Sequence, residues 1–437
     1  MKTGGFTLRN KPDKAIAVLF LLFFFITPVY TDGFYLPENV EVRNQLSELF
    51  STDPQSLLRE RRRTFNQVFE PHRVQFRVAQ QHGHVYLVFS NEVSYQFPVY
   101  SPGTYIAKRN LETGDLIQVK IFLGPGPESF LRIYPEGNRS RIDVHLLGRC
   151  IQRSLMLSVP INRVLIAPFQ EVLRHAGNRI NWEYFHPLVE QSPSEQVREI
   201  GAQVRERLGE LPDIDDGALD DSGRWVFIET EYEQFDSRGF NCSGFAKYVV
   251  DGLVLPRTGS MLPIDLLKTT HPDFRGNQWS LRHEDSRDPY FGLDWSRNLA
   301  LAAQGCTETE IRENPEAADV TDLPFLRYSE DVGYPVEEIE FALYLSSIQN
   351  PGNIYLGSVN QPYTIDQGPV LRQHVHLVVF FPWFDSLGNF HVDVMERNVE
   401  TSVRSLEARY PGDFIHLVRI PAETSYSLPR LPEISGE

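Results

Sequence analysis

Apolar and polar residues alternate between residues 73 and 161, and this period of two limits what that part of the chain can form. Runs such as Val74–Val78, His84–Phe89 and Asp115–Phe122 follow the pattern and are separated by turn-forming residues. Successive side chains of a strand point to opposite faces of a sheet, so the alternation predicts strands with one buried face. We expect about seven short strands here, forming an all-β sandwich or barrel domain over residues 73–161.

The first 31 residues have the layout of an export signal. Four basic residues precede the apolar run Ala15–Thr27, which Pro28 ends. A basic start followed by about a dozen apolar residues is typical of a secretory signal, and a membrane-spanning helix needs roughly 20. The cleavage site lacks one of its usual small residues, so residues 1–31 form either a signal peptide or an N-terminal anchor. Both interpretations place the body of the protein in the periplasm or outside the cell.

Composition excludes several classes of function. The net charge is −16 and the sequence pI about 5.3, so nucleic acid is not an expected partner, because phosphate binding needs a basic surface. Membrane contact is expected only through the N-terminal segment. No CxxC, P-loop or dinucleotide fingerprint occurs, and neither a metal nor a cofactor is predicted. Cys150 and Cys306 could pair, or all three cysteines could be reduced.

The rest of the chain divides by pattern. Residues 32–72 are expected to form a polar helical linker, whose cluster Arg59 and Arg61–Arg63 suits a solvated helix face better than contact with anionic lipid or polymer. A second, α+β domain is expected over 162–425, with a loose tail at 426–437. A capping box at Ser192–Glu195 begins its most regular helix. Residues 253–345 are expected to be a long insertion that forms a lid or substrate wall.

A lone cysteine stands at the start of another helix in this second domain. Asn241 is a cap residue, Cys242 follows it, and an apolar helical pattern runs from Ser243 until Asp251-Gly252. The free N–H groups and the positive end of the helix dipole stabilise a thiolate there. A buried structural cysteine is the alternative, since free cysteine is among the most buried residue types.

Histidines that could serve such a thiolate lie on a later hairpin. The strand Gln373–Phe381 carries His374 and His376, which period two places on one face. A turn at 385–389 leads to the return strand Phe390–Met395, which carries His391. Neighbouring strands lie about 4.8 Å apart, so a contact between histidines across the hairpin is feasible.

These features resemble the NlpC-type cell-wall cysteine peptidases, which have a papain-like fold. The resemblance rests on Phe240-Asn241-Cys242-Ser243-Gly244-Phe245, on Tyr232 ten residues before the cysteine, and on the histidine-bearing hairpin. It covers about residues 192–251 and 370–420. Asn241 stands where the family usually has Asp, and the 133 residues between Cys242 and His376 exceed the family's usual separation.

The resemblance implies roles for these residues. Cys242 would be the nucleophile, His391 would orient the base, and Tyr232, Asn241 and Ser243 would support the thiol and the oxyanion, which the Cys242 N–H would hold. Either His374 or His376 would be the base. His376 is preferred, because the family has Gly or Ala two positions after its histidine, and the His374 register puts the bulky His376 there.

The sequence thus predicts an exported cysteine hydrolase of α+β class. As the resemblance implies, its papain-like domain would follow the β-domain and cleave an amide bond in peptidoglycan stem peptides through an acyl-enzyme. Two alternatives stay open. One is an acyltransferase or amidase on the same fold, acting on a lipid or another small amide substrate. The other is a secreted binding protein whose hydrolase domain is catalytically degenerate.

Overall fold

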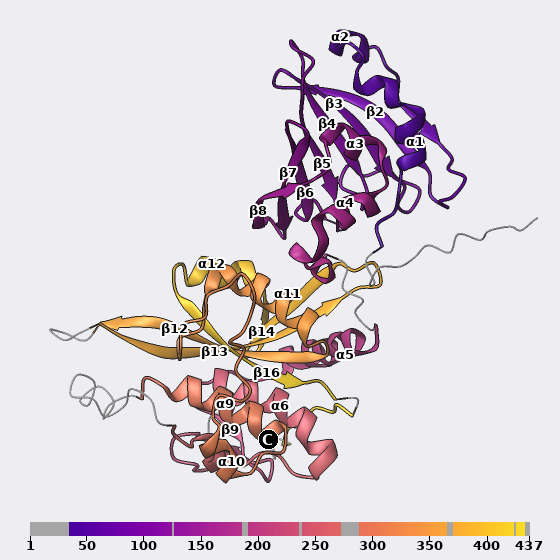
Figure 1. Cartoon of the computed structure of the whole chain (residues 1–437). Coiled ribbons are helices and arrows are strands. Elements are labelled where there is room, and N and C mark those ends of the chain that lie inside the picture. Colours follow the sequence, from indigo (N-terminus) through magenta and orange to yellow (C-terminus); the bar gives the residue numbers. More distant parts are fainter. Residues whose placement is uncertain are drawn as a thin grey trace, which may run out of the picture.

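The computed structural model describes residues 35–124, 126–185, 191–235, 238–271, 288–364, 370–423 and 425–432. Two units are visible, an N-terminal unit up to residue 185 and a C-terminal unit from residue 191 (Figure 1). The signal or anchor predicted for 1–31 lies outside the described residues. Among the residues that are described, no helix is long and apolar enough to cross a membrane.

The N-terminal unit is built on one antiparallel sheet of eight strands, in which each strand pairs with the next along the chain. The strands are β1 (Arg63–Phe65), β2 (Val74–Gln81), β3 (His84–Asn91), β4 (Tyr105–Asn110), β5 (Leu116–Phe122), β6 (Phe130–Glu136), β7 (Arg139–Leu146) and β8 (Arg149–Leu157). Alternating burial confirms the predicted period of two. Ile142 and Val144 are buried on β7, for example, while Arg141 and Asp143 are only partly covered.

Helices, and not a second sheet, cover the buried face of these strands. They are α1 (Val40–Gln45), η1 (Ser47–Phe50), α2 (Pro54–Leu57), α3 (Ile161–Ile166), α4 (Phe169–Ala176), η2 (Gly177–Arg179) and η3 (Trp182–Tyr184). Val42, Leu57 and Val164 share one hydrophobic core with the strands. The expected sandwich or barrel is therefore corrected to a single sheet with a helical layer. The expected linker at 32–72 is part of this unit, as is the helical stretch after residue 161.

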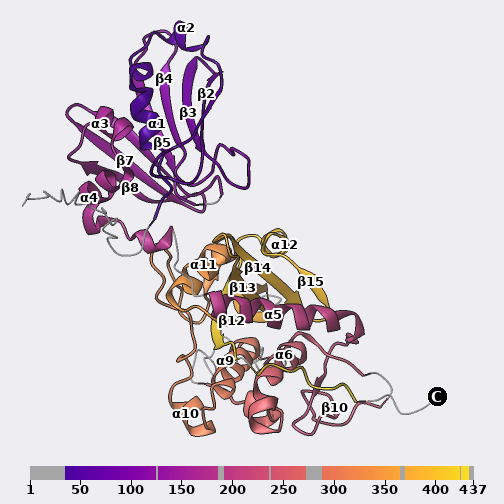
Figure 2. The ribbon, with the colours of Figure 1, turned by 90° about the vertical axis from the view of Figure 1, so that its right-hand side faces the viewer.

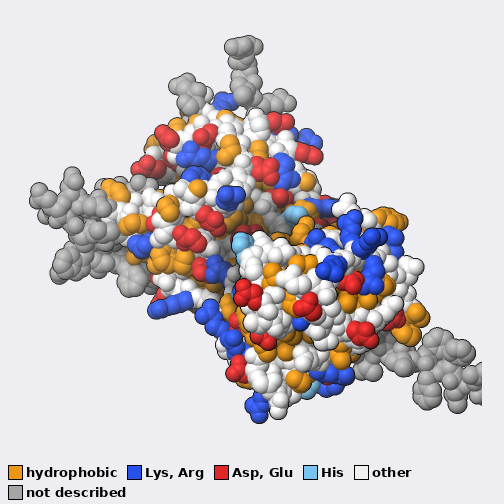
Figure 3. Space-filling view, turned by 90° about the horizontal axis from the view of Figure 1, so that it is seen from above, with side chains coloured by type: hydrophobic (Ala, Val, Ile, Leu, Met, Phe, Trp, Pro, Cys, Tyr) orange, Lys and Arg blue, Asp and Glu red, His pale blue; other side chains and the backbone are white. Residues whose placement is uncertain are grey.

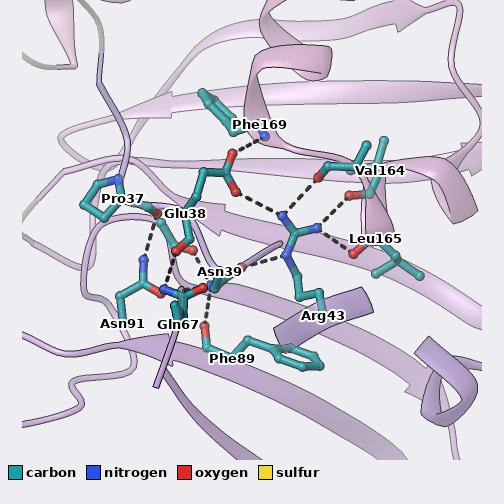
Figure 4. A network of polar contacts seen from close by, with 12 residues as sticks. Pro37, Glu38, Asn39, Arg43, Gln67, Phe89, Asn91, Val164, Leu165 and Phe169 are labelled. Carbon is teal, nitrogen blue, oxygen red and sulfur yellow. Dashed lines mark hydrogen bonds and ion pairs between the residues drawn. The ribbon is translucent and has the colours of Figure 1, made fainter. Parts of the chain in front are cut away.

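A fully buried arginine fastens this helical layer (Figure 4). The Arg43 guanidinium donates hydrogen bonds to the main-chain oxygens of Val164 and Leu165 at 3.2 and 2.5 Å, and to the Asn39 side chain at 2.6 Å. It pairs with Glu38 at 3.2 Å and lies 3.7 Å from the centre of the Tyr105 ring. A buried cation needs such partners, so Arg43 ties α1 to α3 across the core.

The C-terminal unit contains a six-stranded antiparallel sheet with the strand order β11-β16-β12-β13-β14-β15. Its strands are β11 (Tyr334–Pro335), β12 (Asn353–Thr364), β13 (Val370–Phe384), β14 (Phe390–Glu396), β15 (Val399–Thr401) and β16 (Phe414–Pro421), and a separate short pair is formed by β9 (Ala218–Leu219) and β10 (Trp225–Val226). The predicted hairpin is confirmed as β13 and β14.

Helices cover both faces of this sheet (Figures 1 and 2). One hydrophobic core joins a face of the sheet to α5 (Gln191–Arg207), α6 (Cys242–Thr258) and α9 (Phe291–Ala303). The opposite face packs against α11 (Ile339–Gln349) and α12 (Val403–Arg409). The remaining short elements are η4 (Leu208–Glu210), α7 (Ile264–Leu267), α10 (Glu308–Glu313) and η5 (Val336–Glu338). The antiparallel sheets and packed helices confirm the α+β class.

The predicted insertion at 253–345 is more integrated than expected. Its helix α9 is buried along almost its whole length, and Trp295 and Leu299 belong to the core that contains α6. The Trp295 indole N–H donates to the Ser243 carbonyl oxygen at 3.0 Å. This region therefore includes a central helix of the unit, although α7 and α10 are short.

Side chains from both units meet at their junction. Arg149 of β8 pairs with Glu338 at 2.6 Å, and its guanidinium lies 5.1 Å from the centre of the Phe341 ring on α11. The Tyr344 hydroxyl donates to the Tyr184 carbonyl oxygen at 2.5 Å. The core of the N-terminal sheet is thereby continuous with the core under α11.

Candidate active site

The cysteine is the first residue of α6, as the sequence predicts. The Asn241 side chain caps the helix by accepting a hydrogen bond from the Gly244 N–H at 2.8 Å. The first N–H groups of a helix have no intrahelical acceptor. Within the described residues, neither the Cys242 nor the Ser243 N–H has a recorded acceptor. Two main-chain donors therefore stand beside the thiol, where an oxyanion would form.

Three glycines let the chain approach this helix start closely. A Cβ on Gly244 would lie 1.9 Å from the Gly217 carbonyl oxygen, and a Cβ on Gly217 would lie 2.2 Å from the Gly239 carbonyl oxygen. Both separations are far below van der Waals contact. Asn241 also donates its N–H to the Gly217 oxygen at 3.1 Å. The Gly-containing loop before β9 thus fixes the position of Cys242.

A chain of charged and polar groups leads from the thiol across the hairpin. The Cys242 thiol and the His376 imidazole of β13 line the same cavity and lie close enough for each to shift the pKa of the other. The Nε2 of His376 lies 2.6 Å from the Glu396 carboxylate at the end of β14. The other oxygen of this buried carboxylate pairs with Arg409 of α12. The structure therefore places a thiol, an imidazole and a carboxylate in the order that an activated nucleophile needs.

The charges of these neighbouring side chains favour an ion pair between Cys242 and His376. Burial opposes ionisation of the thiol, but the polar interaction with His376 and the charge of its imidazole outweigh it and lower the pKa of Cys242. Burial likewise disfavours the charged imidazole, but Cys242 and Glu396 together raise the pKa of His376 to about 9. The pKa of Glu396 is lowered despite its burial, because His376 and Arg409 both bond to it. Both shifts act in the direction that favours a thiolate beside an imidazolium.

The second candidate base has a different environment. A β-bulge between the histidines pairs His376 with Val359 and His374 with Asn360. His374 is buried, and its ring nitrogens lie 2.9 Å from the Ser358 hydroxyl and 2.9 Å from the Asp331 carbonyl oxygen. Burial and the neighbouring His416 lower the pKa of His374 to about 3. The structure therefore brings His376 to the thiol and leaves His374 as a neutral, fully bonded neighbour.

His391, the predicted orienting residue, does not reach the site. It is exposed, stacks on Trp383 at 4.2 Å between ring centres and lies 3.5 Å from the Asp385 carboxylate. His391 pairs with Trp383, which is seven residues from His376 along β13. At about 3.3 Å per residue that separation is roughly 23 Å. Glu396 occupies the place expected for His391.

The sequence did contain a signal for Glu396. The hairpin turns at residues 385–389, so counting equal steps from Phe384 and Phe390 places Glu396 opposite Val378, which is two residues from His376 and on the same face of β13. Register arithmetic of this kind excludes His391 and points to the residues after Met395. The family resemblance implies a second histidine in this role, and the prediction therefore named His391.

The supporting residues are placed as follows. Asn241 caps the helix, and Ser243 is buried in its first turn. Tyr232, expected beside the thiol, is instead 75% exposed and is absent from the cavity walls described below. Its carbonyl oxygen accepts a hydrogen bond from the Phe227 N–H in a surface turn. The expectation for Tyr232 is therefore corrected. All three cysteines are free thiols.

Cys242 and His376 open into a cavity of about 670 Å3. The region 253–345 supplies one wall through residues that include Lys268, Phe291 and Gly292. Two cationic side chains in the lining are already paired, Lys268 with Glu231 at 2.6 Å and Arg397 with Asp213 at 3.0 Å. No group of three or more His, Cys, Asp or Glu side chains that could hold a metal ion occurs in the described part of the chain.

Comparison with known families finds one match. Residues 32–184 match a family described as a domain of unknown function, DUF8515. This range coincides closely with the N-terminal unit, including the helices that precede and follow its strands in the sequence. No curated protein and no solved structure matches the chain.

Proposed function

We propose that the protein is a cysteine hydrolase that cleaves an amide bond. The observation that carries this proposal is the Cys242–His376–Glu396 chain, in which α6, β13 and β14 each supply one group. A helix start, a raised imidazole pKa and a buried carboxylate all favour the thiolate, which is the reactive form of cysteine. A structural cysteine needs none of these three features.

The reaction follows from the positions of these groups. The Cys242 thiolate attacks the amide carbonyl carbon, and the N–H groups of Cys242 and Ser243 donate to the oxyanion that forms. His376 gives its proton to the leaving amine as the C–N bond breaks, which leaves an acyl-enzyme. Neutral His376 then takes a proton from water, whose oxygen attacks the thioester, and the acid is released with the thiolate restored. Glu396 keeps the imidazole oriented throughout.

The substrate that we propose is the stem peptide of peptidoglycan in an exported setting. Support comes from the resemblance to NlpC-type peptidases, from the order of cysteine helix and histidine strand, and from the N-terminal export pattern. The alternative of a degenerate binding domain is weakened by the arrangement of Cys242, His376 and Glu396 in one site. An acyltransferase would use the same groups with a different acceptor.

Two measurements test this proposal at separate levels. Iodoacetamide at pH 6 should alkylate Cys242 much faster than Cys150 and Cys306, because only Cys242 has a cationic partner that favours the thiolate. Equal, slow labelling of all three would contradict the activated nucleophile. Digestion of purified muropeptides should release new amino groups with the wild type and none with Cys242→Ala. If Cys242 labels fast but no amine appears, the peptidoglycan assignment fails while the thiol chemistry stands.

A further inference from the structure

Arg397 has a main-chain conformation that arginine seldom adopts. Glu396 pairs with Val399 across the turn between β14 and β15, so Arg397 and Asn398 form a two-residue turn. The φ of Arg397 is 50°, and Gly, Asn or Asp is the usual residue in such a conformation, because a Cβ crowds the neighbouring main chain. Residues held in this way cluster at functional sites. The strain therefore points to a use for the Arg397 side chain.

The Arg397 side chain lines the cavity that contains Cys242 and His376. Its positive charge is among those that lower the pKa of Cys242, so the guanidinium acts on the thiol from the cavity wall. Arg397 also follows directly after Glu396, whose carboxylate lies 2.6 Å from His376. The turn thus carries one residue that contacts His376 and, next to it, a cation that borders the cavity.

Only one nitrogen of this guanidinium has a recorded hydrogen bond within the described residues. Its Nη1 donates to the two carboxylate oxygens of Asp213 at 3.0 and 3.1 Å. Asp213 is not among the described residues that line the cavity, and its main chain pairs with Phe240, close to the start of α6. A guanidinium can bind a carboxylate through two parallel N–H groups, and Nε and Nη2 are left for such an acceptor.

The ion pair with Asp213 is weak. The two side chains are 37% and 38% exposed, and solvent screens exposed ion pairs. Such a pair does not mark a site by itself, since Lys and Arg side chains lie near Asp and Glu side chains at many places on the face that Figure 3 shows. What distinguishes Arg397 is its place in the cavity wall together with its strained main chain. A ligand carboxylate can bind beside Asp213 or take its place.

Several carboxylates line the same cavity. They include Asp215, Asp216 and Glu229, and the Asp216 carboxylate accepts hydrogen bonds from the N–H groups of Ile228 and Glu229 at 3.1 and 3.2 Å. These negative charges repel an anion, so an acidic group of a substrate is tolerated only where a cation receives it. A phosphate, with close to two negative charges, is repelled more strongly than a carboxylate with one.

We propose that Arg397 binds a carboxylate of the substrate. The role rests on the proposed hydrolase function and narrows its substrate to amides with an acidic group near the bond that is cleaved. Lys268, the other Lys or Arg side chain of the described lining, already has two oxygen partners, the Glu231 carboxylate at 2.6 Å and the Glu229 carbonyl oxygen at 3.4 Å. Arg397 has the unused donors and the nearby carboxylate that show which ligand its guanidinium accepts.

The ratio of two alkylation rates at Cys242 tests this role without a peptide substrate. Iodoacetate carries a carboxylate and iodoacetamide does not, and a change in the pKa of the thiol affects both rates equally and cancels in their ratio. Mass spectrometry of the Cys242 peptide measures both rates. Arg397→Gln should lower the iodoacetate-to-iodoacetamide ratio about three- to fivefold, the effect of an exposed ion pair. Arg397→Lys should lower it by a smaller factor, because lysine keeps the charge and loses the planar fork.

Asp213→Asn separates ligand binding from a structural role of the ion pair. It removes the same pair, but it leaves Arg397 in place without a competing carboxylate, so the ratio should rise. A purely structural pair would make Asp213→Asn and Arg397→Gln change the ratio in the same direction. The matched control is Arg257→Gln, which breaks a similarly exposed pair with Glu423 about 22 Å along α6 from Cys242. This control should leave the ratio unchanged.

The proposal is overturned if Arg397→Gln leaves the ratio unchanged, if Asp213→Asn lowers it, or if Arg257→Gln changes it as much as Arg397→Gln does. Slow labelling of Cys242 by iodoacetamide would instead contradict the activated nucleophile, and the ratio can still be measured. If muropeptides are cleaved, Arg397→Gln should raise KM about three- to fivefold with little change in kcat. Muropeptides whose carboxylates are converted to amides should show no such rise, and an equal rise for both would overturn the role of Arg397.

Discussion

Glu396 lies between two cations, and this position determines how strongly it acts on the thiol. Arg409 keeps the carboxylate ionised, and the ionised carboxylate stabilises the imidazolium of His376. The imidazolium in turn stabilises the Cys242 thiolate. Each group therefore depends on the charge of the next, and removing one charge should be detectable at the sulfur.

Glu396→Gln keeps the shape of the side chain and removes its charge. We expect the pKa of His376 to fall below about 9 and the pKa of Cys242 to rise, because the imidazolium that stabilises the thiolate is lost at lower pH. The midpoint of the pH profile of iodoacetamide alkylation should move upward. Hydrolysis should slow on the order of 10²-fold, because the base is no longer oriented.

Glu400→Gln is the matched control for this change. Glu400 lies on the neighbouring strand β15, and its partner is Arg205, at 2.7 Å, not a residue of the site. The pH profile of alkylation of the Glu400→Gln variant should equal that of the wild type. A profile for Glu396→Gln that also matched the wild type would show that Glu396 does not act on the His376–Cys242 pair.

At the scale of elements, the position of α6 depends on the close contact between Gly244 and the loop before β9. Gly244→Ala places a methyl group 1.9 Å from the Gly217 carbonyl oxygen, and a main-chain atom cannot move aside as a flexible side chain can. We expect the free energy of unfolding to fall by about 1–3 kcal/mol, as for other overpacked sites. Urea denaturation measures this loss.

Gly209→Ala provides the comparison. A Cβ there meets no atom within 4 Å, and Gly209 has no positive φ. The free energy of unfolding of the Gly209→Ala variant should stay within about 1 kcal/mol of the wild-type value. A slight rise is expected, because alanine restricts the unfolded chain. Equal stability of Gly244→Ala and Gly209→Ala would mean that α6 can shift freely, and the packing argument for Cys242 would fail.

Helices and strands were predictable from the sequence where only one of their faces is buried. The alternation in β7 and the spacing of Val197, Ile200 and Val204 in α5 both mark a single buried face, and both elements were found. Helix α9 is buried on nearly all sides, so its sequence does not mark one buried face, and its region was expected to be an insertion. Alternation also says nothing about what covers a strand, which is why a helical layer was mistaken for a second sheet.

The residues of the site were also predictable only where a local sequence pattern marks them. Asn241, Cys242 and Gly244 are neighbours in sequence, and their local pattern predicted the cap, the nucleophile and the helix together. His376 could be preferred but not separated from His374, because the β-bulge that gives them different partners has no sequence signature here. Glu396 was within reach of the hairpin register, whereas Arg409 depends on how α12 packs against the sheet, which no local pattern predicts.

At the scale of the whole molecule, a few side chains join the two units. Arg149 is central to this junction, since it pairs with Glu338, donates to the Glu337 carbonyl oxygen at 2.9 Å and lies over the Phe341 ring. The ion pair is partly exposed, so solvent screens it and its contribution is small. The ring contact and the hydrogen bond add to it.

Arg149→Ala should therefore weaken the coupling between the units by about 1–2 kcal/mol. Scanning calorimetry should show the unfolding endotherm broaden or divide, because the N-terminal unit no longer gains as much from its contact with α11. Arg153→Ala, at an exposed position of the same strand, should leave the endotherm unchanged. If both variants unfold as the wild type does, the continuous core between the units, and not Arg149, couples their unfolding.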